Sequence, residues 1–95
     1  MGRVREGQDP LIVYLVRLEE PYRPELDLVM PTTEVVRLAL GLGDYWAERA
    51  VQWLEAGVPP ETLQKELGEL VGQQRRRQRL RHRAMRFIIP SDVEG

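Results

Sequence analysis

Apolar residues recur every three or four positions over most of the chain after Pro31, which is the spacing of an α-helix with one buried side. The pattern predicts helices near residues 33–42, 44–56 and 60–88. Glycines and prolines stand between these segments, where helices commonly end and begin. Gly72 is expected to break the last helix, because a glycine inside a helix costs about 1 kcal/mol relative to alanine.

Two of these helices begin with residues that can cap a helix. Thr32 and Thr33 stand at the start of the first, and Asp44 stands at the start of the second. Side-chain oxygens of these residue types accept hydrogen bonds from the backbone N–H groups of the first helical turn. We therefore expect a side-chain cap at both helix starts.

Residues 10–30 are compatible with two different structures. The run from Leu11 to Val16 is rich in β-branched and aromatic residues, which favours a strand, and residues 26–30 alternate weakly between apolar and polar. The two stretches could pair as a β-hairpin around residues 21–24, which would have to pack on helices or on a second chain to be stable. Asp9-Pro10, in contrast, is typical of a helix start. The segment is expected to form either an extra helix or a β-hairpin.

Residues 1–95 are expected to form one mainly α domain, a small helical bundle with a long C-terminal helix broken near Gly72. Apolar residues make up 42% of the chain and charged residues 31%, a composition typical of a globular protein. Ninety-five residues suit one hydrophobic core and not two. Residues 1–9 are polar and are expected to form a loose lead-in, and residues 89–95 a frayed tail.

The composition also excludes several classes of site and of location. The chain has no cysteine and a single histidine, His82, so disulfides, thiolate metal sites and histidine-rich metal sites are excluded; we expect no metal and no cofactor. The longest unbroken apolar run has six residues, against about 20 for a bilayer-spanning helix. The N-terminal residues lack a secretory-signal pattern. We expect a cytoplasmic protein without membrane contact.

Positive charge is concentrated near the carboxyl end, although the net formal charge of the chain is −1. Residues 75–87 hold seven of the thirteen arginines. Residues 1–70 carry 7 basic and 13 acidic side chains, whereas residues 71–95 carry 7 basic and 2 acidic ones. Opposite charges on the two parts should attract each other, within one chain or between chains.

If the basic segment is helical, its arginines are not distributed evenly around the axis. At about 100° per residue, five of them fall within about 100° of the helix surface, beside an apolar stripe of Leu80, Ala84, Phe87 and Ile88. Arg77 and Arg81 lie inside or next to that stripe. The five, called the arginine ridge below, are Arg75, Arg76, Arg79, Arg83 and Arg86.

Guanidinium groups bind carboxylate and phosphate oxygens through two parallel hydrogen bonds, so the ridge predicts an acidic counterpart. Two features argue against nucleic-acid binding. Bases usually stack on aromatic side chains, and the ridge contains no aromatic residue. The pI near 5.8 is also low for a nucleic-acid-binding domain. We therefore predict a non-catalytic binding or regulatory protein that uses the ridge against an acidic protein surface or for self-association. Nucleic-acid binding through phosphates is the alternative. The carboxylates available within the chain include Glu19, Glu20, Glu25, Asp27, Glu48 and Glu55.

Other motifs give weaker indications. Trp46 and Trp53 are two helical turns apart and are expected in the core, with Tyr45 at the surface. Residues 33–56 match the helix-turn-helix of DNA-binding proteins poorly, because Arg37 stands where that motif has alanine and the second helix begins with acidic residues. No carboxylate is combined with a cysteine, a catalytic histidine or a glycine-rich phosphate loop, so we expect neither an enzyme nor a small-molecule substrate.

Overall fold

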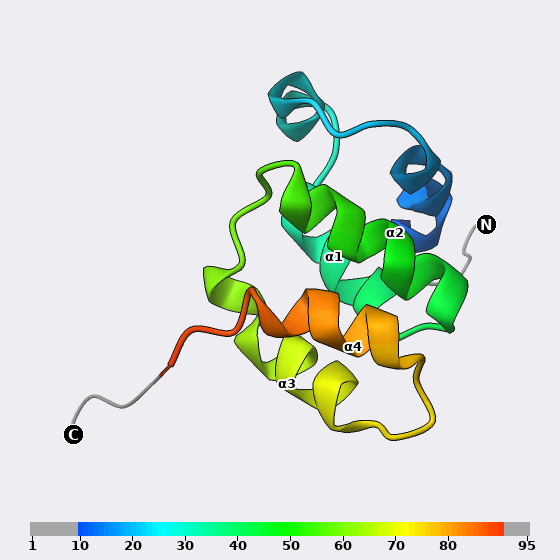
Figure 1. The fold of residues 1–95 in the computed structure, drawn as a ribbon. Coiled ribbons are helices and arrows are strands. Elements are labelled where there is room, and N and C mark those ends of the chain that lie inside the picture. The colour runs from blue at the N-terminus through cyan, green and yellow to red at the C-terminus, as the bar shows by residue number, and fades with distance from the viewer. Residues whose placement is uncertain (1–9, 91–95) are drawn as a thin grey trace.

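The computed structural model describes residues 10–90, and over this range the chain is mainly helical and contains no strand (Figure 1). The expected fold class is thereby confirmed. Residues 1–9 and 91–95, which include the expected lead-in and most of the expected tail, lie outside the described residues. In chain order the elements are the 3-10 helices η1 (Pro10–Glu19) and η2 (Pro24–Leu28), the α-helices α1 (Thr32–Leu40) and α2 (Asp44–Glu55), the 3-10 helix η3 (Glu61–Leu63), and the α-helices α3 (Gln64–Gly72) and α4 (Gln78–Met85).

The four α-helices form the body of the molecule in two pairs (Figure 1). α1 packs along α2 and α3 along α4, while α4 also lies against α2 and α3 against α1. Small residues such as Ala47, Ala50 and Ala84 are completely buried, which lets helix backbones approach closely. α4 thus has one side in the core and the other toward solvent. The core also includes Val35, Val36, Leu40, Val51, Trp53, Leu63, Leu67, Leu70 and Leu80.

The segment expected to be a helix or a hairpin forms two 3-10 helices, so the hairpin alternative is wrong. A 3-10 helix has three residues per turn, so residues three apart share one side. In η1, Leu15 and Leu18 share the buried side, and Val13 and Val16 share an exposed side. η1 lies against α1 and α2, which give its buried side a place in the core.

The expected long helix over residues 60–88 divides into separate short helices. α3 ends at Gly72, as the glycine predicts, residues 73–77 form a turn, and α4 then runs back along α3. The reversal has a physical reason, because it returns Leu80 and Ala84 to the core beside α3. A straight helix would have carried these two apolar side chains away from it.

Helix α2 ends in a Schellman motif. The N–H of Val58 donates to the carbonyl of Trp53 and that of Gly57 to the carbonyl of Leu54, both at 3.1 Å. Gly57 has a φ of 127°, a conformation that side-chain-bearing residues rarely adopt. Gly57 thus ends α2, as its place after the predicted helix 44–56 indicates, whereas Gly41, which follows α1, has a φ of −91°.

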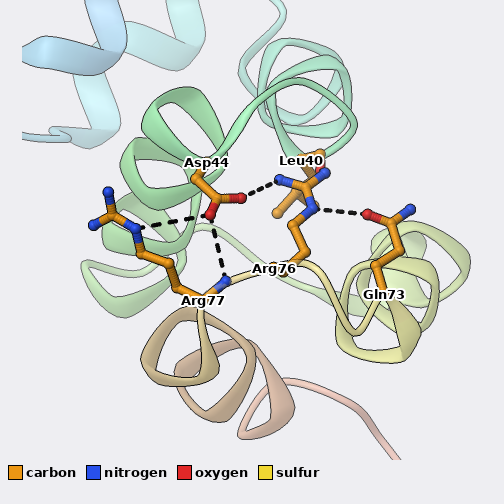
Figure 2. A network of polar contacts seen from close by, with 5 residues as sticks. All are labelled: Leu40, Asp44, Gln73, Arg76 and Arg77. Atoms are coloured by element: carbon orange, nitrogen blue, oxygen red, sulfur yellow. Dashed lines mark hydrogen bonds and ion pairs between the residues drawn. The ribbon is translucent and has the colours of Figure 1, made fainter.

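The expected side-chain caps are absent from both helix starts. Pro31 is the N-cap residue of α1 and Gly43 that of α2, and neither start has a side-chain cap hydrogen bond. Asp44 is instead the first residue of α2, and its carboxylate points toward the arginines of the α3–α4 turn (Figure 2). Because Asp44 does not cap α2, its carboxylate is available for ion pairs with Arg76 and Arg77.

Candidate functional site: the C-terminal arginines

The arginine ridge does not lie on one helix. Arg75 and Arg76 belong to the turn between α3 and α4, Arg79 and Arg83 belong to α4, and Arg86 follows its last residue. The single-helix geometry expected from the sequence is therefore wrong, because the chain reverses direction after Gly72. As a result, the five arginines have different environments.

Arg76 points into the molecule, and only 6% of its surface is exposed. Its Nε donates to Gln73 Oε1 at 2.7 Å, and one terminal nitrogen donates to Asp44 Oδ1 at 3.0 Å (Figure 2). The other terminal nitrogen donates to the carbonyl of Leu40, the last residue of α1, at 3.3 Å. The last carbonyls of a helix have no partner within it, so Arg76 satisfies one of them while neutralising a carboxylate. This side chain holds the ends of three helices together.

Asp44 also receives contacts from the next residue, Arg77. The backbone N–H of Arg77 donates to Asp44 Oδ2 at 3.4 Å, and its Nε lies 3.9 Å from the same oxygen (Figure 2). The Arg77 side chain is 72% exposed, so it adds positive potential near Asp44 at little cost in desolvation. Asp44 thus anchors the α3–α4 turn to the start of α2.

Arg83 connects the other end of α4 to α2. Its Nε and one terminal nitrogen donate to the two oxygens of Glu55, at 2.9 and 2.8 Å, the bidentate geometry that planar guanidinium groups favour. A second carboxylate, that of Glu48, lies two helical turns before Glu55 on the same side of α2. One of its oxygens is 3.8 Å from a terminal nitrogen of Arg83. The hydrogen bond from Arg83 is the main cause that holds the pKa of Glu55 below its ordinary value. The same bond raises the pKa of Arg83.

Arg81, which the sequence placed within or beside the apolar stripe, also has a structural contact. Its Nε donates to the carbonyl of Val71, in the last turn of α3, at 3.0 Å. This bond satisfies a second helix-end carbonyl, as Arg76 does for α1. Arg81 thereby fixes α4 beside α3 through a polar contact at the edge of the core.

Three members of the ridge remain exposed: Arg75, Arg79 and Arg86. None of them forms an ion pair or a side-chain hydrogen bond with another residue in the range 10–90. Arg79 and Arg86 are seven residues apart, which places them on the same side of the helical path. Exposed His82 and Met85 lie between them in sequence. The outer side of α4 is therefore basic and partly apolar.

Sequence reasoning identified Glu48 and Glu55 as available partners for the arginines, and both contact Arg83. It missed Asp44, which had been assigned to a helix cap. The acids of the first 30 residues make no contact with the C-terminal arginines within the described structure. The signal that would have found Asp44 is its spacing, since Asp44, Glu48 and Glu55 fall on one side of α2, the side that faces α4.

The described residues contain no group of three or more histidine, cysteine, aspartate or glutamate side chains arranged to hold a metal. No helix within residues 10–90 is long and apolar enough to cross a bilayer. Comparisons of the chain with protein-family models, with curated proteins and with solved structures found no match.

Proposed function

We propose that this protein is a non-catalytic binding protein whose exposed C-terminal arginines contact an acidic surface of a protein partner. The observation that carries the proposal is the division of the ridge. Arg76 and Arg83 are occupied by carboxylates of the same chain, whereas Arg75, Arg79 and Arg86 keep their guanidinium groups exposed. The ion pairs of Arg76 and Arg83 stabilise the fold, whereas the three exposed guanidinium groups are left for a partner.

The surroundings of the exposed arginines suit a protein surface. Met85 is 48% exposed beside Arg86, so a partner can bury apolar area while its carboxylates bind the guanidinium groups. Charges at the rim of such a contact mainly set orientation and association rate, and apolar burial adds affinity. The structure also supplies rigidity, because Arg81 and Arg83 fix α4 to α3 and α2.

The test is a charge reversal confined to the exposed arginines. A variant with Arg75→Glu, Arg79→Glu and Arg86→Glu is compared with the wild-type protein for binding to poly-L-glutamate at low ionic strength. The wild type should bind and lose affinity as salt rises, while the variant should not bind and should keep its helical circular dichroism. These substitutions spare Arg76, Arg81 and Arg83, so the fold should survive them.

A matched control reverses the same number of charges elsewhere. Arg17, Arg23 and Lys65 are exposed and lie outside the C-terminal segment, so their replacement by glutamate should leave binding to poly-L-glutamate largely intact. Equal loss in the control, or no binding by the wild type, would contradict the proposal.

The alternative function, contact with nucleic-acid phosphates, uses the same three arginines and is tested with the same variants on polyuridylate. A nucleic-acid-binding protein should bind polyuridylate with a steep salt dependence and prefer it to poly-L-glutamate. A phosphate backbone would bind along a continuous row of arginines. Arg76 and Arg83 are already paired with carboxylates of the chain, which interrupts this row and favours the protein partner.

A further inference from the structure

Two exposed acidic side chains without an ion pair among the described residues lie in η2. Glu25 and Asp27 are exposed, and neither forms an ion pair with a residue in the described part of the chain. Asp27 accepts only a hydrogen bond from the Tyr22 hydroxyl, at 3.0 Å. Leu28 and Val29, which follow directly, are 86% and 64% exposed. This corner of the molecule is therefore acidic and apolar, the complement of the outer side of α4.

A cavity of about 280 Å³ opens beside Asp27. Its lining includes the apolar residues Met30 and Pro59, together with Thr32. Thr32 is 6% exposed, and its hydroxyl has no hydrogen-bond partner among residues 10–90. A buried hydroxyl without a partner is unfavourable, so this wall of the cavity contains an unsatisfied polar group.

The chemistry of this cavity suits the side chain of an arginine. Such a side chain has an apolar stem and a planar head with five N–H donors and no acceptor. The apolar lining can cover the stem, and the carboxylate of Asp27 can accept from the head. Glu34 also lines the cavity and adds negative charge, although it is already paired with Arg37.

The exposed arginines of the same chain cannot reach this cavity. Figure 1 shows η2 at one end of the molecule and α4 toward the other, with α1 and α2 between them. Any contact between the two surfaces must therefore join two copies of the chain.

We infer that the acidic partner is a second copy of this chain: an exposed arginine of the 75–86 segment of one copy inserts beside Asp27 of the next. This inference rests on the proposed function and specifies its partner. Charge complementarity supports it, since Glu25 and Asp27 are exposed acids without an ion pair among the described residues, and Arg75, Arg79 and Arg86 are exposed arginines without one. Apolar complementarity also supports it, because Leu28 and Val29 can cover Met85 and Ile89, which are each 48% exposed.

The contact joins two different surfaces of the chain. Two copies that lie antiparallel satisfy both contacts and close a dimer, whereas a copy that binds through its arginines alone still offers its acidic corner to a further copy. The protein should therefore form dimers or larger species as its concentration rises at low ionic strength, and salt should dissociate them.

The experiment exchanges charges between the two surfaces. One variant carries Glu25→Arg and Asp27→Arg, and the other carries Arg75→Glu, Arg79→Glu and Arg86→Glu. Each variant alone should sediment as a monomer, because its two surfaces repel each other. An equimolar mixture should regain association, because each surface again meets an opposite charge. A control with Glu61→Arg and Glu69→Arg, two exposed acids of η3 and α3, should associate like the wild type.

The outcomes separate this inference from the proposed function. A wild type that stays monomeric at all concentrations, or a mixture of the two variants that stays monomeric, would overturn the inference. So would normal association of the variant with reversed acids. In each case, binding of poly-L-glutamate by the wild type would leave the proposed function standing, whereas its absence would remove both.

Discussion

The guanidinium of Arg76 donates to the carboxylate of Asp44 at 3.0 Å, across 32 positions of the chain. Arg76 lies in the turn between α3 and α4, and Asp44 is the first residue of α2. Only 5% of the arginine side chain is exposed, against 29% for the aspartate. The pair therefore joins the two halves of the bundle at a place that water barely reaches from the arginine side.

Replacing Arg76 by methionine should lower the free energy of unfolding by about 2–4 kcal/mol, because it leaves Asp44 and the carbonyl of Leu40 without their charged donor. Urea denaturation followed by circular dichroism measures this change. Arg75→Met, at the exposed neighbouring position, is the control and should change stability by less than about 0.5 kcal/mol. Similar losses in the two variants would show that Arg76 has no special structural role.

The Arg83–Glu55 pair predicts a dependence of stability on acid pH. The pKa of Glu55 is lowered from 4.5, first by the hydrogen bond from Arg83 and further by the charges of Arg83 and Arg86. The folded state therefore binds this proton less tightly than the unfolded state. Its contribution to stability is present above about pH 4.5 and is lost as pH falls through the lowered pKa.

Glu55→Gln should therefore destabilise the protein by about 0.2–1 kcal/mol at pH 7 and by much less near pH 3. Thermal unfolding at both pH values tests this, with Glu69→Gln as the control at an exposed carboxylate without an ion pair among the described residues. A stability difference between the wild type and Glu55→Gln that does not shrink in acid would contradict the assigned coupling.

Two glycine substitutions should act in opposite directions. Gly57→Ala should destabilise the protein by about 1–2 kcal/mol, because a side chain is strained at a φ of 127°. Gly68→Ala should stabilise it by about 0.5–1 kcal/mol, because Gly68 lies inside α3 and an added Cβ would meet no atom within 4 Å. Thermal unfolding of both variants provides the measurement, and equal signs would disagree with the described backbone.

Trp53 connects the N-terminal segment to α2, since its indole N–H donates to the carbonyl of Glu20 at 2.9 Å. Trp53→Phe removes this bond and should cost about 1–3 kcal/mol in stability. Amide hydrogen exchange should also quicken in residues 11–22 more than in α3. The control is Trp46→Phe, because the indole of Trp46 is only half-buried and donates no hydrogen bond to a described residue. If exchange quickens uniformly, Trp53 does not act as a local connection.

The helices of the central region could be predicted from sequence because their apolar spacing and their flanking glycines and prolines agree. The predicted 33–42 and 44–56 correspond to α1 and α2 to within two residues. Trp53 is buried and Tyr45 is 53% exposed, as expected from their positions on α2. These features depend on local spacing, which a sequence contains directly.

The directions of the arginines could not be predicted in the same way. A helical wheel assumes one continuous axis, and the turn over residues 73–77 rotates Arg75 and Arg76 independently of α4. Whether Arg76 is buried depends on where Asp44 and Leu40 lie, and both are more than 30 positions away. The 3-10 geometry of η1 likewise depends on packing against α1 and α2, because local propensity for β-branched residues favours a strand.

Some of the C-terminal arginines contact the folded chain and others do not, so a peptide of this segment should behave differently from the intact protein. Arg76, Arg77, Arg81 and Arg83 contact other parts of the folded chain, so three of the seven arginines, Arg75, Arg79 and Arg86, lack a side-chain contact with another described residue. A synthetic peptide copied from residues 75–86 would offer all seven to solution at once. It should bind polyanions such as heparin more tightly than the intact protein does, and peptide arrays would therefore overstate the affinity of the folded chain for such ligands.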